Sequence, residues 1–342
     1  MISDPIEGDR LAGSPHPRER FDLIGHADTE AELLAAWQAN RLPHAILLGG
    51  PQGIGKATLA YRLTRFVLSG GRNDAADLSL PEDHPTSRQV AALSHPDLLV
   101  LRRTKEEDKK AISQVIRVED TRRLTSFFGS TAAYGGWRVC VVDAVEEMGK
   151  ESANAILKML EEPPGRSLFI LISHTPGRLL PTIRSRCRRL TMKPLSSGEV
   201  AKALSSLSEV LPDIDPMQFA SAAEASQGSV GRALSLLLGG EDGLEILEMT
   251  RALLARLPQV ESASISALGD KLRGDNLGVF AEAVEDWLAG AATSGDDPAR
   301  LAQFAEAWDK VRRATATAEI YNLDRKPLVF QVFTMLSEAA RG

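Results

Sequence analysis

The segment Gly50–Thr58 constrains the fold more than any other part of this 342-residue chain. A short apolar run at residues 44–48 precedes it, and apolar residues recur at helical spacing over residues 58–68. A buried strand, a glycine-rich loop and a helix in this order form the setting in which a P-loop cradles phosphate groups with its backbone N–H groups. The sequence therefore predicts a P-loop fold.

This loop keeps most of the groups that a P-loop uses. The glycines and the lysine of the pattern are Gly50, Gly53, Gly55 and Lys56. The next residue normally holds Mg²⁺ through a hydroxyl group, but here it is Ala57. Thr58 points about 100° further round the helix and is a poor substitute. Two interpretations stay open: the loop binds ATP or ADP, or it is a relic that binds nucleotide weakly or not at all.

Strand-like and helix-like segments alternate after the loop. Apolar runs at residues 97–101, 137–143 and 167–173 indicate three further strands, with helical patterns between them. This alternation predicts a parallel sheet with helices on both faces. After residue 195 the strand signal ends and the pattern is helical. The expected fold class is therefore α/β followed by all-α.

The same changes of pattern suggest domain boundaries. We expect an α/β domain over residues 21–195, a small helical domain over 196–240 and longer amphipathic helices over 241–342. Residues 1–20 are polar, rich in Pro, Gly and Arg, and lack the apolar core of a signal peptide. The sequence predicts that they form a flexible leader.

Composition excludes several functional classes. The net charge of −6 argues against a broadly basic nucleic-acid binder, although not against a local basic patch. The only cysteines are Cys140 and Cys187, which excludes a disulfide scaffold and a four-cysteine zinc site. No apolar run reaches transmembrane length, so we expect a cytoplasmic protein without membrane contact.

The strand at residues 137–143 ends in a carboxylate, Asp143, where P-loop ATPases carry their Walker B aspartate. Active ATPases usually place a glutamate directly after it to orient the attacking water, but here that residue is Ala144. Glu146 and Glu147 lie further along and are expected to face elsewhere. Because the hydroxyl ligand and this carboxylate are both missing, we do not expect efficient ATP hydrolysis within the chain.

A short basic turn at residues 182–187 carries Arg186. An arginine supplied to a neighbouring subunit can neutralise the charge that develops on a γ-phosphate during hydrolysis. The residues alone favour a surface arginine in a basic cluster with Arg184, Arg188 and Arg189. Both interpretations remain open at this point.

Four runs of sequence carry a resemblance to a known family. They are Leu42-Pro43-His44-Ala45, Ser94-His95-Pro96-Asp97, the block from Asn154 to Pro164 (NAILKMLEEPP), and the block from Leu180 to Cys187 (LPTIRSRC). With these motifs the chain resembles the delta-prime subunits of bacterial DNA polymerase III, in the clamp-loader branch of the AAA+ proteins. The resemblance covers residues 20–240 well and the rest thinly, where residues 322–326 still match.

The resemblance implies an AAA+ core, a helical lid and a helical collar that holds a five-membered ring together. It implies that Arg186 is an arginine finger acting in trans, with Ser185 and Cys187 fixing its turn. It places Ser173 at the sensor-1 position. The sensor-2 arginine position falls on Gly231, with Arg232 displaced by one residue.

The resemblance also implies partners. These are gamma/tau and delta subunits in a hetero-pentameric ring, and, through the complex, a sliding clamp and primer–template DNA. Candidates for DNA contact lie around Arg117–Arg123, where a solvated helix face is an equal alternative. No zinc site is carried over, because residues 70–93 contain no cysteine. Polymerase chemistry would belong to another subunit of the assembly.

A competing interpretation is an ATP-hydrolysing subunit of the gamma/tau type. Ala57, Ala144 and Gly231 each stand where such a subunit carries a working group, and they oppose that interpretation.

Overall fold

The computed structural model describes most of the chain. The described residues are 7, 9–11, 13–104, 113, 115–116, 118–211, 214–238, 242–272, 276–293, 298–321 and 323–341. The chain divides into two compact units, Met1–Pro212 with Ser226–Gly231, and Asp213–Ala225 with Arg232–Gly342. The expected domain boundaries at residues 20, 195 and 240 stay predictions.

The first unit is built on a five-stranded sheet in the order β2-β3-β4-β1-β5. The strands are β1 (Ala45–Gly49), β2 (Leu98–Arg102), β3 (Arg138–Asp143), β4 (Ser167–Ser173) and β5 (Arg188–Thr191). Every pair of neighbouring strands is parallel, which confirms the predicted parallel sheet. The sequence patterns do not predict β5, because only Leu190 in this edge strand is buried and it has no apolar run.

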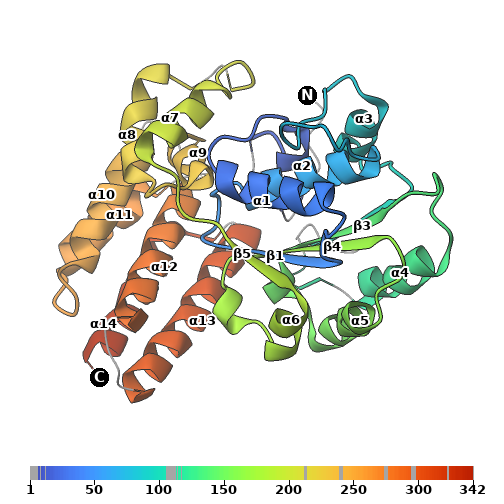
Figure 1. The fold of residues 1–342 in the computed structure, drawn as a ribbon. Helices are drawn as coiled ribbons and strands as arrows, with labels where there is room; N and C mark the ends of the chain where they lie inside the picture. Colours follow the sequence, from blue (N-terminus) through green and yellow to red (C-terminus); the bar gives the residue numbers. More distant parts are fainter. Residues whose placement is uncertain are drawn as a thin grey trace. The chain divides into compact units, whose positions relative to one another are not determined.

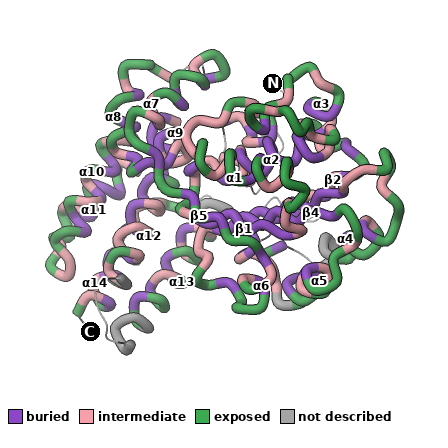
Figure 2. The backbone as a smooth tube through the Cα atoms, viewed as in Figure 1, coloured by how far each residue is buried: buried purple, intermediate pink, exposed green. Residues whose placement is uncertain are grey.

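Helices cover both faces of this sheet (Figure 1). They are α1 (Ala27–Gln38), α2 (Lys56–Leu68), α4 (Val118–Gly129), α5 (Lys150–Glu161) and α6 (Pro181–Arg186). The unit also contains α3 (Pro85–Ala91) and α7 (Ser197–Ser205). Side chains alternate along β1: Ile46 and Leu48 pack with α1 and α2, whereas Ala45 and Leu47 pack with α4, α5 and α6. Strands covered on both faces are buried throughout, as the purple tube in Figure 2 shows.

The described part of residues 1–20 packs on this unit, where the sequence predicts a flexible leader. A short 3₁₀ helix spans Pro17–Glu19, and His16 and Arg18 are buried. The guanidinium of Arg65, itself buried, donates to the carbonyl of Arg18 at 3.0 Å. Burial of a polar side chain costs free energy unless the side chain finds such a partner. Composition alone therefore suggested an exposed segment.

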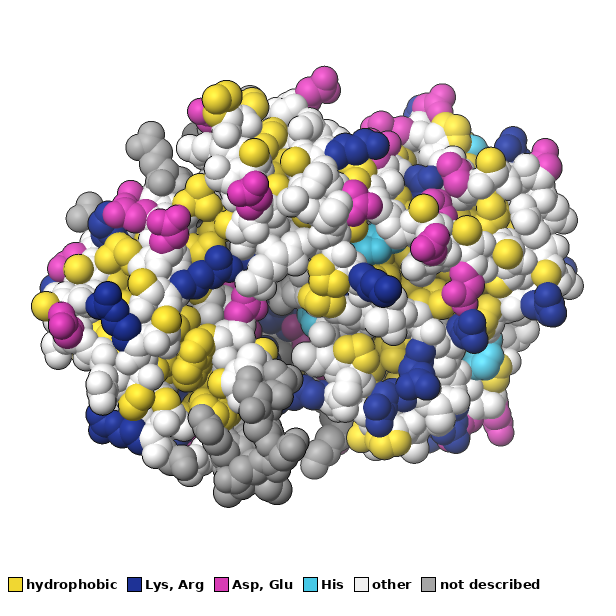
Figure 3. Space-filling view, turned by 60° about the vertical axis from the view of Figure 1, so that its left-hand side comes forward, with side chains coloured by type: hydrophobic (Ala, Val, Ile, Leu, Met, Phe, Trp, Pro, Cys, Tyr) yellow, Lys and Arg dark blue, Asp and Glu magenta, His cyan; other side chains and the backbone are white. Residues whose placement is uncertain are grey.

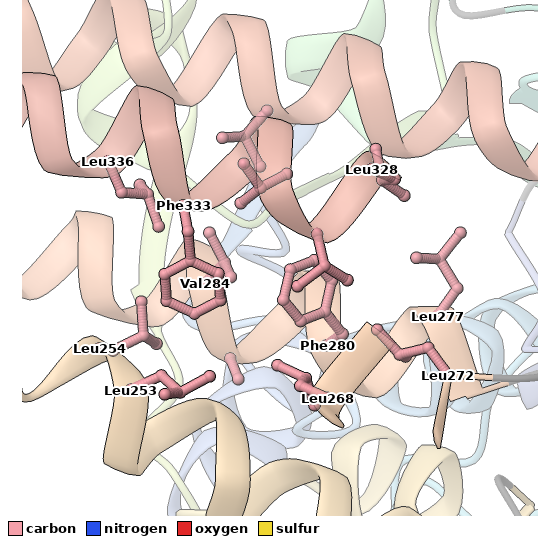
Figure 4. Close-up of a cluster of buried hydrophobic side chains, with 14 of the residues drawn as sticks. Leu253, Leu254, Leu268, Leu272, Leu277, Phe280, Val284, Leu328, Phe333 and Leu336 are labelled. Atoms are coloured by element: carbon pink, nitrogen blue, oxygen red, sulfur yellow. The ribbon is translucent and has the colours of Figure 1, made fainter. Parts of the chain in front are cut away.

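The second unit is helical in its described parts, which confirms the predicted all-α half. Its helices include α8 (Phe219–Ala225), α10 (Gly243–Leu254), α11 (Ser262–Lys271), α12 (Leu277–Thr293), α13 (Pro298–Ile320) and α14 (Arg325–Arg341). Helix α9 (Val230–Leu238) begins in the first unit and continues in the second. Leucines and phenylalanines from α10, α11, α12 and α14 meet in one core (Figure 4). Across the described residues, no helix combines the length and apolar character needed to cross a membrane.

Candidate functional site

The predicted P-loop links the carboxyl end of β1 to the start of α2. Gly53 and Gly55 have positive φ angles of 74° and 104°, which favour glycine. A side chain at Gly50 would place its Cβ 2.4 Å from the carbonyl oxygen of Met192. The conformation of the loop therefore requires glycine at these three positions.

Lys56 is turned toward its own loop. Its side chain is buried, and its Nζ donates to the carbonyl of Gly50 at 2.7 Å and to that of Pro51. Burial lowers the pKa of Lys56 to about 8, although the charges of Asp143 and Glu146 act in the opposite direction. A phosphate would have to replace two carbonyl contacts to reach this ammonium group.

Asp143 ends β3 and is buried. Burial, reinforced mainly by the charge of Asp9, raises the pKa of Asp143 to about 7. The next residue, Ala144, is also buried and supplies no carboxylate. Asp143 thus lies at the strand end where the sequence predicts a Walker B aspartate, and the residue after it has no carboxylate.

Glu146 and Glu147 are held by other parts of the fold. An oxygen of Glu146 accepts hydrogen bonds from the backbone N–H groups of His174 at 2.6 Å and Thr175 at 3.2 Å. Glu147 forms an ion pair of 2.8 Å with Arg103. Glu146 still lies near the cleft, because its charge acts on the pKa of Lys56. Sequence reasoning missed this role, since no motif marks a carboxylate that fixes a loop after a neighbouring strand.

Ser173 lies beside the P-loop at the end of β4. It is the register partner of Gly49, and its carbonyl accepts from the N–H of Gly50 at 3.3 Å. Its hydroxyl is buried and has no hydrogen-bond partner among the described residues. An unpaired buried hydroxyl at this place suits a residue that would contact a phosphate.

The segment 226–231 packs directly on the P-loop. The hydroxyl of Ser229 donates to the carbonyl of Gln52 at 2.9 Å, and the N–H of Gly231 donates to the carbonyl of Gly53 at 3.0 Å. A Cβ on Gly231 would lie 2.9 Å from the Cα of Gly53. The expected sensor-2 position therefore has no room for an arginine in this conformation. Ser229 carries no recognisable signal in the sequence for its contact.

Arg232, the arginine displaced by one residue, belongs to the second unit. Its Nη2 lies 2.6 Å from a carboxylate oxygen of Asp286, and its Nε lies 3.7 Å from one of Glu282. Both acids are on α12. Arg232 is thus an ion-pair partner of that helix.

Arg186 is the last residue of α6. Its Nη1 donates to the carbonyl of Thr182 at 3.0 Å and to the hydroxyl of Ser185 at 3.4 Å. Its Nη2 lies 2.8 Å from a carboxylate oxygen of Glu161, and 35% of its side chain is exposed. The guanidinium is therefore held at the surface by short contacts within the same turn and with α5.

The two residues beside Arg186 face different surroundings. Ser185 is exposed, and its hydroxyl donates to the carbonyl of Thr182 at 3.1 Å. Cys187 is buried among the apolar side chains of α5 and the sheet. Burial raises the pKa of the Cys187 thiol to about 11, so the thiol is neutral at pH 7. Ser185 thus forms a hydrogen bond within the turn at the surface, and Cys187 packs the end of the turn into the core.

The predicted residues fall into two groups at opposite ends of the parallel strands. The cleft residues, namely Gly50, Gly53, Gly55, Lys56, Asp143 and Ser173, lie at the carboxyl ends of β1, β3 and β4. In β5, Arg188 pairs with Ile46 near the amino end of β1. Because these strands are parallel, Arg186 lies just before the amino end of β5. The structure therefore separates Arg186 from the cleft of its own chain.

Two arginines of the region predicted to contact DNA are exposed. Arg122 and Arg123 on α4 are exposed, whereas Arg117 lies outside the described residues. Figure 3 shows several Lys and Arg side chains gathered in the right-hand half of one face, intermixed with acidic and apolar groups. A role in DNA contact stays a prediction.

The sequence of this chain is similar to those of several known proteins. A family model described as "DNA polymerase III, delta subunit" matches residues 25–196, half of the chain. A Pseudomonas aeruginosa protein named DNA polymerase III subunit delta' is 42% identical over 50% of this chain and 48% of its own length. The Escherichia coli delta' subunit is 29% identical over 90% of this chain and 81% of its own.

Two further likenesses have lower coverage or similarity. A Haemophilus influenzae tau/gamma subunit is 29% identical over 66% of this chain and 31% of its own length. The alignments thus span about half of the Pseudomonas relative and a third of the Haemophilus relative. Among solved structures, a Thermotoga maritima RuvB variant aligns over 83% of this chain and 94% of its own, at 17% identity and a TM-score of 0.46.

Proposed function

Because the chain belongs to the delta-prime family of DNA polymerase III clamp-loader subunits, we propose that it acts as the stator of a clamp loader. In this role Arg186 enters the ATP site of a neighbouring gamma/tau subunit and assists hydrolysis there. The complex then loads a sliding clamp on primed DNA. The chain itself contributes positioning and charge, and polymerisation belongs to other subunits.

The separation of Arg186 from Lys56 is the observation that carries this proposal. A parallel strand of five residues spans roughly 16 Å, and the two side chains lie beyond opposite ends of such a strand. Arg186, with 35% of its side chain exposed, lies at the other end of the strands from the predicted phosphate cradle of its own chain. It is available to another molecule that docks against α6.

The proposed chemistry is electrostatic. Phosphoryl transfer spreads negative charge over the oxygens of the γ-phosphate, and a guanidinium placed there stabilises the transition state. An arginine finger supplied in trans is worth roughly 10³–10⁵ in rate. The short contacts of Arg186 with Thr182 and Ser185 limit the freedom that the side chain loses on docking.

We propose further that the chain's own cleft does not turn over ATP. Ala57 cannot ligate Mg²⁺, and Ala144 cannot orient water. Gly50, Gly53, Gly55, Lys56, Asp143 and Ser173 would hold ATP or ADP if the cleft binds it. For this the ammonium of Lys56 must leave the carbonyls of its own loop.

The proposed setting is a hetero-pentameric ring with gamma/tau and delta subunits in the cytoplasm. The helices of the second unit would supply the collar contacts. Arg122 and Arg123 would contact the DNA backbone, in a way that weakens as salt rises and does not depend on base sequence.

Reconstitution with variant subunits tests the finger. In a complex that contains Arg186→Ala, DNA-stimulated ATP hydrolysis is expected to fall at least tenfold, while assembly is unchanged. Arg189→Ala, which removes the same charge from an exposed residue nearby, serves as the control. Equal hydrolysis rates with both variants would remove the finger role. If the isolated chain hydrolysed ATP in a manner that needs Lys56, the gamma/tau-type alternative would replace the stator.

A further inference from the structure

Glu161 and Arg186 form an ion pair that joins the ends of two helices. Glu161 is the last residue of α5 and Arg186 is the last residue of α6. One oxygen of Glu161 lies 2.8 Å from Nη2 of Arg186. Both helices pack on the same face of the sheet, so the backbone holds the partners in place.

The ion pair uses the nitrogen that a phosphate would need. A guanidinium binds an oxyanion bidentately through one of two forks, Nε with Nη2 or Nη1 with Nη2. Both forks include Nη2, which Glu161 contacts. Nη1 already donates to Thr182 and Ser185. Each fork uses a different hydrogen of Nη2, so Glu161 competes with a phosphate through its negative charge and its place beside Nη2, not by occupying both forks.

The pair is placed so that it can exchange. About half of the Glu161 side chain (49%) and 35% of the Arg186 side chain are exposed. Ion pairs at such exposure are weak, because water screens both charges. A γ-phosphate carries more negative charge than one carboxylate and accepts both hydrogens of a fork.

We propose that Glu161 is a positioning residue that holds the guanidinium of Arg186 until the triphosphate of a neighbouring subunit displaces it. This inference rests on the finger role proposed above. Glu161 keeps the guanidinium paired with an opposite charge beside the end of α5 in the free subunit. This contact must break each time Arg186 binds the triphosphate. Glu161 therefore affects the ATP concentration at which the neighbouring site is half-saturated.

Removal of the charge on Glu161 tests the inference. Glu161→Gln keeps the shape of the side chain and an accepting oxygen, but the competing charge is gone. Glu162→Gln makes the same change at the adjacent exposed residue and is the matched control. ATP hydrolysis by the full reconstituted complex is measured against ATP concentration. For Glu161→Gln we expect the half-saturating ATP concentration to fall about 1.5- to 5-fold with an unchanged maximal rate. For Glu162→Gln we expect no change.

Arg186→Ala in the same series separates the two claims. If Arg186→Ala slows hydrolysis but Glu161→Gln leaves half-saturation unchanged or raises it, the finger stands and the role of Glu161 is overturned. An equal fall with Glu162→Gln would overturn it too, because net charge alone would then explain the effect. If Arg186→Ala changes nothing, the finger role and the inference fail together. Thermal unfolding of each variant subunit checks that its fold is intact.

Discussion

Arg186 and Lys56 lie at opposite ends of the strands of one parallel sheet. Lys56 follows the carboxyl end of β1, and Arg186 precedes β5, whose Arg188 pairs with Ile46 near the amino end of β1. The five residues of β1 lie between the two positions and span roughly 16 Å. This arrangement is the basis for the proposal that Arg186 serves the ATP site of another subunit.

Close packing of Gly231 on Gly53 predicts a stability effect. Gly231→Ala places a Cβ 2.9 Å from the Cα of Gly53, a backbone atom that cannot move without shifting the P-loop. We expect a loss of about 1–3 kcal/mol in the free energy of unfolding, measured with urea. Gly198→Ala is the control, because a Cβ at Gly198 meets nothing within 4 Å. Equal stabilities of the two variants would contradict the packing.

Repair of one missing group is not expected to create an ATPase. Ala57→Ser restores a hydroxyl for Mg²⁺, but Ala144 still lacks a carboxylate for the attacking water. Phosphate release by the isolated Ala57→Ser chain should stay at the wild-type background. Robust turnover that disappears with Lys56→Ala would show that the cleft needs only this one group.

The contacts of Asp9 with Arg102 and His16 predict a loss of stability in acid. Burial raises the pKa of Asp9, but hydrogen bonding and charge from His16 and Arg102 outweigh burial and hold that pKa below its ordinary value. A carboxylate with a depressed folded-state pKa stabilises the fold fully above the unfolded value of about 3.9. This contribution disappears as the pH falls through the lower folded-state value.

Asp9→Asn tests the sign. Its free energy of unfolding should decline less than that of the wild type below about pH 4, since the variant has no charge to lose. Asp83→Asn removes a carboxylate from an exposed residue and should follow the wild type. If the free energy of unfolding fell in parallel with pH for all three proteins, the pKa of Asp9 would not be depressed in the folded state.

The two thiols are expected to be inert in the folded chain. Burial raises the pKa of Cys187 to about 11, and it raises the pKa of the fully buried Cys140 still further. Because the thiolate is the reactive form, a thiol reagent at pH 8 should label neither residue until the protein is unfolded. Rapid labelling of one thiol per native chain would mean that the turn at Cys187 opens in solution.

Periodic patterns predicted the elements that are buried on both faces. The apolar runs of β1, β3 and β4 have no other stable environment than the centre of a sheet, so local sequence was sufficient for them. β5 was missed because an edge strand needs only one buried side chain, Leu190. The burial of His16 and Arg18 was missed because it depends on partners far along the chain, such as Arg65.

The amino-acid sequence alone determined the P-loop, its missing hydroxyl at Ala57 and the basic turn that carries Arg186, since each depends on residue type and close spacing. Only the tertiary structure decided that Lys56 contacts its own loop, that Gly231 packs on Gly53, and that Glu161 holds Arg186. These contacts join segments whose separation in the sequence carries no periodic signal. Their geometry is fixed by strand order and helix packing, which form only when the whole unit has folded.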